Sequence, residues 1–179
     1  HIQSAHCENG VTTSLLKHKG ADFLTEPLAF GIGAGLFYIH IPFVKFSGGP
    51  AISYRSMPGT VFSRTCKSLH IPLVRKKFSD EKKAQEFLDQ ALAKNIDVGC
   101  QVGVFHLDYF PKQYRFHFNA HNMVVYGKEN DTYLISDPVM EDVTTLSAEE
   151  LERVRFAKGV FAPKGHIYYP VSFPDKIDL

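Results

Sequence analysis

The chain has no tryptophan, only three cysteines and almost no net charge: 20 Lys and Arg residues face 19 Asp and Glu residues, a formal net charge of +1 at pH 7. This balance gives no electrostatic reason to expect nucleic acid or an anionic membrane as a partner. The cysteines are irregularly spaced and form no CxxC pair, so neither a disulfide framework nor a structural zinc site is indicated. We expect a protein of the reducing cytoplasm, without a metal or cofactor.

Long apolar segments are also missing. The longest apolar stretch, Pro27 to Val44, contains three glycines, His40 and Pro42, and lacks the roughly 20 unbroken residues of a membrane helix. We interpret it as a core segment. With 44% apolar and 22% charged residues, the chain can bury one sizeable core, which predicts a single globular domain over residues 1–179.

Cys7 lies at the start of a predicted helix, a position that favours ionisation of a thiol. The tripeptide His6-Cys7-Glu8 opens a segment from about Cys7 to His18 in which Val11 and Leu15 recur at helical spacing. A thiol at a helix start lies among unpaired backbone N–H groups and at the positive end of the helix dipole, which favours thiolate over thiol. We therefore predict that Cys7 is a nucleophile.

A base and an orienting acid are found on a predicted hairpin far downstream. Residues 121–127 and 133–136 have strand-like patterns, with a short polar stretch between them. If Val124 faces Leu134 in an antiparallel pair, then His121 faces Asp137 in the same register. The Cβ atoms of such a pair lie roughly 5 Å apart, within reach of an imidazole to carboxylate hydrogen bond. A slip of one residue would break this contact.

Cys7, His121 and Asp137 together fill the roles of nucleophile, base and orienting group in a triad. Each residue also has an ordinary explanation, because free cysteines are usually buried apolar groups and Asp before Pro is common in turns. For Cys66 and Cys100, inside apolar stretches, we expect burial alone. No His or Cys pair has the compact spacing of a metal site, and we expect none.

The remaining pattern predicts an α+β fold, with N-terminal helices packed on an antiparallel sheet. Thr25 is the expected N-cap of a helix with Pro27 in its first turn, Ser79 the expected cap of a helix ending near Asn95, and Ser147 with Glu150 a capping box. Further elements are expected at Pro58–Leu69 (helix), Leu73–Arg75 (strand), Val98–Leu107 (strand) and His166–Tyr169 (strand), and the segment Asp175–Leu179 has a helix-like mix of polar and apolar residues.

Four residues are candidates for substrate contacts. Glu26 has two open readings, a carboxylate facing the site and one that favours a helix N-terminus. Tyr109, Lys112 and Arg115 lie in an aromatic loop before the His121 strand, and such loops either bind substrate or pack on the core. We expect the two cations to meet an acidic partner and Tyr109 to line the path of its substrate arm.

These residues carry a family resemblance. The sequences 5–8 (AHCE) and 24–31 (LTEPLAFG), together with the His121 strand and Ser136-Asp137-Pro138, resemble the N-terminal domain of the butirosin biosynthesis protein H family. The hairpin is also similar, more distantly, to that of the double-glycine leader peptidases. The resemblance implies a papain-like fold, the roles given above for Cys7, His121 and Asp137, and a second domain that follows this one. Gln3 is the tentative oxyanion donor, although such a glutamine usually stands about six residues before the cysteine.

The resemblance implies transfer of an acyl or aminoacyl group from an acyl carrier protein or another thioester donor to an amine, as in antibiotic or secondary-metabolite biosynthesis. In this hypothesis Cys7 attacks a carrier thioester, and a small amine acceptor then takes the acyl group. Two alternatives stay open at this point: a cysteine peptidase or amidase on the same triad, and a catalytically silent binding domain.

Overall fold

The computed structural model describes residues 1–46 and 48–174, and the predicted helix-like segment Asp175–Leu179 lies outside them. The helices are α1 (Cys7–His18), α2 (Glu26–Ile32), α3 (Val61–Ser68), α4 (Glu81–Leu92) and α5 (Ala148–Arg155), with a 3-10 turn, η1, at Lys112–Tyr114. Within the described ranges, no helix has the length and apolar character required to cross a bilayer.

A six-stranded antiparallel sheet forms the centre of the molecule. Its spatial order is β3-β8-β4-β5-β6-β7. The strands are β3 (Leu73–Lys76), β4 (Val98–Val102), β5 (His121–Glu129), β6 (Thr132–Ser136), β7 (Thr144–Ser147) and β8 (Ile167–Pro170).

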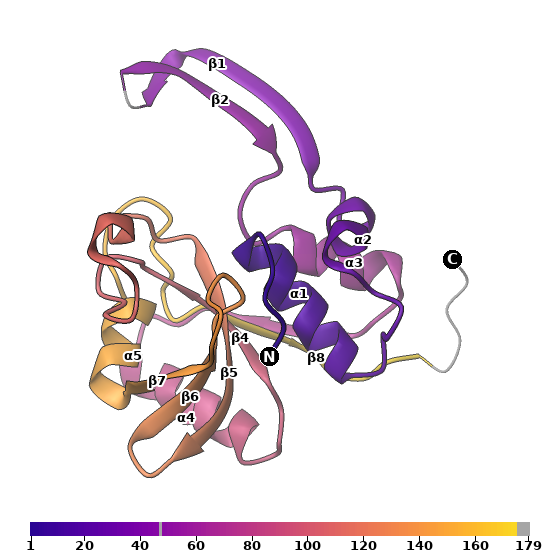
Figure 1. The fold of residues 1–179 in the computed structure, drawn as a ribbon, viewed down its shortest axis with the longest axis vertical. Helices are drawn as coiled ribbons and strands as arrows, with labels where there is room; N and C mark the ends of the chain where they lie inside the picture. Colours follow the sequence, from indigo (N-terminus) through magenta and orange to yellow (C-terminus); the bar gives the residue numbers. More distant parts are fainter. Residues whose placement is uncertain (47, 175–179) are drawn as a thin grey trace.

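The sheet separates two apolar cores (Figure 1). On one face, α4 and α5 pack against alternating residues of the central strands, such as Met123 and Val125. On the other face, α1, α2 and α3 enclose a second core that reaches the sheet at Val124 and Tyr168. The period of two along β5 therefore places neighbouring residues in different cores. The predicted α+β fold with helices on an antiparallel sheet is confirmed.

Helix boundaries follow the predicted caps with one exception. The Thr25 hydroxyl accepts a hydrogen bond from the Leu28 N–H at the start of α2, and the capping box at the start of α5 is present. The expected cap at Ser79 is wrong: the side chain of Asp80 accepts the N–H of Lys83 at 2.8 Å instead. Because a carboxylate also suits the positive helix end, Asp80 is the better cap.

Two predicted elements are shorter in the structure. Strand β4 ends at Val102, not at Leu107, because the Gly103 N–H bonds the carbonyl of Val154 instead of continuing the ladder. A Cβ at Gly103 would lie 2.6 Å from that of Ala157, so the close approach of the chain at this turn requires glycine. Helix α3 likewise begins at Val61 and not at Pro58.

The segment interpreted as a core segment is partly a projecting hairpin. Strands β1 (Leu36–Phe46) and β2 (Gly49–Arg55) pair only with each other and extend away from the body (Figure 1). Leu36 is 81% exposed and Phe43 84% exposed. Apolar composition predicted burial for these residues, but a two-stranded ribbon has no second layer to cover it. The prediction is wrong for this part of the stretch.

The hairpin of β5 and β6 forms in another register than expected: the difference is two residues at Val124 and Val125, on the side of the site, and three residues between the bulge and the turn. Val124 faces Ser136 and not Leu134. This pairing is fixed by the two-residue connection between Glu129 and Thr132 and by a bulge between Val125 and Gly127 in β5. Because side chains alternate with a period of two, a displacement of two residues leaves the same side chains on the same face. The expected face relation between His121 and Asp137 therefore survives the wrong register.

Candidate active site

Cys7 is the first residue of α1. Its N-cap, His6, is extended and makes no side-chain hydrogen bond to the helix end, so no side chain caps the first turn. The thiol is 8% exposed and lies beside the start of β5. Unpaired N–H groups and the helix dipole thus act on a nearly buried sulfur.

The His121 imidazole meets the Asp137 carboxylate in the interior. Its Nε2 lies 2.7 Å from Oδ2 of Asp137, which is 0% exposed. The Tyr109 hydroxyl donates to the same oxygen at 2.8 Å, and the N–H of Val139 donates to Oδ1 at 3.2 Å. The predicted hydrogen bond between His121 and Asp137 is present. Asp137 occupies Nε2, which leaves Nδ1 as the ring nitrogen free to act on the Cys7 thiol, whose pKa His121 lowers.

The electrostatics favour a thiolate and imidazolium pair. Burial by itself would raise the pKa of the Cys7 thiol, but the hydrogen bond and charge of His121 and a backbone hydrogen bond from Asn122 outweigh burial and lower it. Burial would also lower the pKa of His121, but the Asp137 carboxylate and the Cys7 sulfur raise it. A lowered thiol pKa beside a raised imidazole pKa moves the proton from sulfur to nitrogen.

The other two cysteines are held as neutral thiols. Burial raises the pKa of Cys66 to about 12 and that of Cys100 to about 11, the latter moderated by Arg155. Both thiols are 0% exposed, as predicted from their apolar surroundings.

We predict that iodoacetamide labels Cys7 well below pH 8.5, the usual pKa of a thiol. In His121→Ala the labelling rate should rise only at higher pH. Burial raises the pKa of the Cys7 thiol, and the His121 imidazole that offsets this effect in the wild type is then missing. Peptide mass spectrometry across a pH series measures both. Faster labelling of Cys66 or Cys100 than of Cys7 in the folded protein would show that Cys7 is not the reactive thiol.

Glu26 holds the backbone that leads into Cys7. Its Oε1 accepts the His6 N–H at 2.8 Å, and its Oε2 accepts the Ala5 N–H at 2.9 Å. This two-point contact links the start of α2 to the start of α1. A carboxylate used in this way positions the backbone, and a substrate contact of Glu26 stays a prediction.

Gln3 lies exposed in the extended segment before α1. The Ser4 N–H beside it bonds the Pro138 carbonyl at 2.7 Å, which fixes this segment next to Asp137. The backbone N–H of Cys7 belongs to the first turn of α1, where His6 provides no side-chain cap. The oxyanion role of Gln3 stays a prediction.

Two of the three candidate residues in the aromatic loop bind groups of this chain. The Tyr109 hydroxyl donates to Asp137, so this side chain contacts the carboxylate that binds His121, and its contact with a substrate arm stays a prediction. The Arg115 Nε donates to the Phe110 carbonyl at 2.7 Å, and its guanidinium also pairs with Asp108. The Arg115 guanidinium therefore binds groups of its own loop. Lys112 is exposed at the start of η1.

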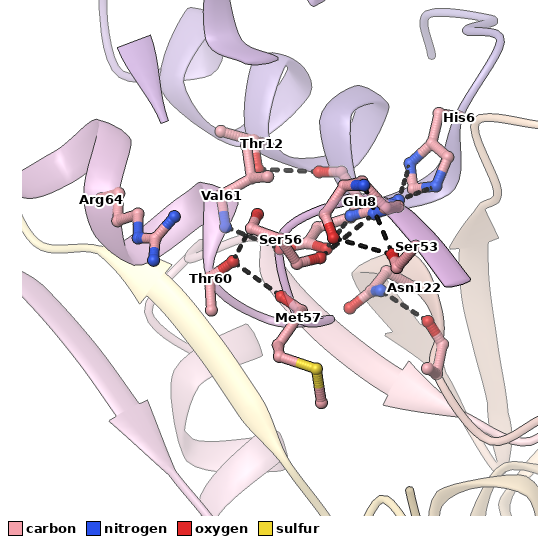
Figure 2. Close-up of polar contacts among 12 residues, drawn as sticks. His6, Glu8, Thr12, Ser53, Ser56, Met57, Thr60, Val61, Arg64 and Asn122 are labelled. Carbon is pink, nitrogen blue, oxygen red and sulfur yellow. Dashed lines mark hydrogen bonds and ion pairs between the residues drawn. The ribbon is translucent and has the colours of Figure 1, made fainter. Parts of the chain in front are cut away.

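Sequence reasoning missed an ion pair next to Cys7, in which the Glu8 side chain is buried and the Arg55 side chain is 28% exposed. Glu8, 1% exposed, accepts Arg55 at 2.7 Å on Oε2 and the Val61 N–H at 2.8 Å on Oε1. Figure 2 shows Glu8 between His6 and the start of α3 at Val61. Arg55 ends β2, so one carboxylate joins α1, α3 and the projecting hairpin.

His6 completes this network as a neutral imidazole. The Arg55 guanidinium lies against its ring (Figure 2 shows the resulting contacts of His6). Burial, and then the positive charges of Arg55 and His121, lower the pKa of His6 to about 4. A neutral ring beside Cys7 adds no charge to compete with His121 for the thiolate.

A metal centre finds no support in the part of the chain that the structure describes, where no group of three His, Cys, Asp or Glu residues is placed to hold an ion. The His117 ring, four residues before His121, stacks on Phe105 with ring centroids 4.0 Å apart.

Comparison with protein families matches residues 6–138 to the model described as butirosin biosynthesis protein H, N-terminal. The chain belongs to this family. No curated protein sequence matches it. In fold, it is similar to a C39-like peptidase from Bacillus anthracis, with 14% identity, a TM-score of 0.67 and coverage of 96% of this chain and 93% of that one. The peptidase domain of Streptococcus ComA, a bifunctional ABC transporter involved in quorum sensing, is also similar, with 17% identity, a TM-score of 0.57 and coverage of 96% and 95%.

At these identities the structural likeness concerns the fold alone, which is papain-like, as the sequence predicted. Family and fold are those of papain-like cysteine enzymes.

Proposed function

We propose that this domain transfers an acyl group from a carrier thioester to an amine through an acyl-Cys7 intermediate. The supporting observation is the buried contact of His121 with Asp137 on one side and Cys7 on the other, with the thiol pKa lowered. Membership of the butirosin biosynthesis protein H family favours a thioester donor over a peptide. The free cysteines favour a reducing compartment, the cytoplasm, as its location.

In the first half-reaction the Cys7 thiolate attacks the thioester carbonyl carbon. The oxyanion that forms faces the N–H groups of the first turn of α1. When the carbonyl reforms, the carrier sulfur leaves with the bonding electron pair and takes the proton from His121. Cys7 then holds the acyl group as a new thioester.

In the second half-reaction an amine attacks the acyl-Cys7 carbonyl. Neutral His121 accepts the amine proton, the Cys7 thiolate leaves, and the product is an amide. The His121 imidazolium and Cys7 thiolate are thereby restored. Asp137 stabilises the imidazolium in both halves and keeps the ring oriented.

Product analysis distinguishes this function from hydrolysis, the reaction class of the two peptidases that are similar in fold. Enzyme acylated by an acyl-pantetheine thioester should yield mainly amide when a small primary amine is added. Exclusive formation of free acid at saturating amine would favour a hydrolase, and rapid cleavage of a peptide without thioester turnover would favour a peptidase.

We predict that the carrier docks over η1, the exposed turn that holds Lys112. An acidic carrier surface should bind more weakly as salt rises, and Lys112→Glu should lower its affinity by about threefold to tenfold. Titration of wild type and variant with an acyl carrier protein measures this, with Lys82→Glu on the exposed face of α4 as the matched control. Equal affinity of Lys112→Glu and wild type would exclude this docking surface.

A further inference from the structure

A cavity of about 520 Å³ opens beside the base of the triad. His121 forms one part of its wall, next to the buried side chains of Val104 and Phe110. The Phe110 ring meets the His121 ring edge-on, with centroids 5.2 Å apart. The cavity volume falls in the range of about 300–1,000 Å³ typical of small-molecule sites.

The outer wall of the cavity consists of aromatic and aliphatic side chains. Phe116 and Tyr114 are 57% and 58% exposed, and Met140, from the loop after Asp137, also lines the cavity. None of the lining residues is an acid, a lysine or an arginine, so His121 is the only ionisable group in the wall that is charged near neutral pH. His121 is already paired with Asp137 and lies next to Cys7, so a charged substituent that enters this cavity would lose water without gaining a free partner.

We propose that this cavity binds an apolar acyl group, an aliphatic or aromatic chain attached to the reacting carbonyl. The inference rests on the proposed function, because it takes the carbonyl to be held between Cys7 and His121. A substituent on that carbonyl lies next to the imidazole, and the cavity is the space that His121 itself borders.

The position of η1 supports this assignment. Pro111 and Tyr114 line the cavity, and Lys112 lies between them in sequence on the exposed side of the same turn. A donor that approaches over η1 therefore reaches the cavity mouth first. A larger cavity of about 680 Å³, beside the end of α1, is bordered by none of Cys7, His121 and Asp137.

The first test measures Cys7 acylation by acetyl-, butyryl-, hexanoyl- and glutaryl-pantetheine. For the three unbranched chains kcat/KM should rise by about threefold to fourfold per added methylene. Glutaryl, similar in length to hexanoyl but ending in a carboxylate, should react about tenfold more slowly than hexanoyl or slower still. In Met140→Lys the ratio of hexanoyl to glutaryl rates should fall by about tenfold, because the new ammonium pairs with the carboxylate.

Phe116→Ala and Phe43→Ala form a matched pair. Both remove an exposed phenylalanine, but only Phe116 lines the cavity, while Phe43 lies on the projecting hairpin. Phe116→Ala should lower the ratio of hexanoyl to acetyl rates, and Phe43→Ala should leave it at the wild-type value. Equal rates for all four thioesters in the wild type would overturn the proposal while leaving the proposed function intact.

The second test reports binding without catalysis. Because the chain has no tryptophan, Phe116→Trp in a Cys7→Ala background places a single tryptophan in the cavity wall, and it can be excited selectively over the eight tyrosines. Hexanoyl-pantetheine should change its fluorescence at lower concentration than glutaryl-pantetheine, and Phe43→Trp should not respond. If the fluorescence responds in this order but no thioester acylates Cys7, the apolar site is supported and the proposed function is wrong. If the two ligands bind equally or not at all, the apolar site is wrong.

Discussion

Replacing Asp137 by Asn should lower the single-turnover rate of Cys7 acylation by about 10³- to 10⁴-fold while leaving the fold intact. The side chain is fully buried, and Oδ2 contacts His121 and Tyr109 at 2.7 and 2.8 Å. An asparagine fits the same space and still accepts from Tyr109. Its amide cannot stabilise an imidazolium as a carboxylate does, so the proton remains with the sulfur and the thiolate is lost.

The rate should be measured by rapid quench with an acyl-pantetheine thioester, and folding by thermal unfolding of the same sample. Asp142→Asn is the matched control, because Asp142 is exposed in the loop that follows. His121→Ala should be slower still, since it removes the base itself. Equal rates for wild type and Asp137→Asn would remove Asp137 from the mechanism.

The second large effect concerns stability. Glu8→Ala should lower the free energy of unfolding by about 3–5 kcal/mol, because it leaves Arg55 without its carboxylate and the Val61 N–H without its acceptor. Glu8→Gln, which keeps an oxygen for the Val61 N–H, should cost less. Glu149→Ala breaks an exposed ion pair with Arg153 at the same 2.7 Å and should change stability by less than about 1 kcal/mol.

Urea denaturation gives these values, and a double-mutant cycle with Arg55→Ala separates pairing from burial. The double variant should be more stable than the sum of the two single losses predicts, because no unpaired charge is left inside. Unfolding of Glu8→Ala within about 0.5 kcal/mol of wild type would show that the pair contributes nothing net.

Local signals predicted the parts of the molecule that depend on nearby residues. The cap at Thr25, the capping box at Ser147 and the extent of α1 each follow from hydrogen bonds within one helical turn. The contact of His121 with Asp137 was also predictable, but for a reason that is only partly right. Side chains alternate with a period of two along a strand, so a register error of two residues at Val124 left His121 and Asp137 on the same face. An error of an odd number of residues at that position would have put them on opposite faces.

Other features depend on partners that the sequence places far away. Arg55 is 47 residues from Glu8, and Tyr109 is 28 residues from Asp137, so no local pattern links them. One signal was available for Glu8: it lies three residues before Val11 and seven before Leu15, on the buried stripe of α1. An acid on such a stripe requires a buried partner, which is a reason to search for an arginine.

The exposure of β1 and β2 was not predictable from composition. Their apolar residues have the pattern of a strand, and whether a strand pair is covered is decided by the rest of the fold. Glu26 illustrates the same limit at the site. Its position at a helix start was clear, but its bond to the backbone before Cys7 requires the packing of α1 against α2.

The central claim, that Cys7 carries the acyl group, is tested most directly by peptide mass spectrometry of enzyme mixed with one equivalent of hexanoyl-pantetheine and quenched with acid. We predict a hexanoyl adduct on Cys7 alone, no adduct in Cys7→Ser on the same timescale, and its disappearance when a primary amine is added before the quench. An unmodified Cys7 in active enzyme, or an adduct on Cys66 or Cys100, would contradict the account.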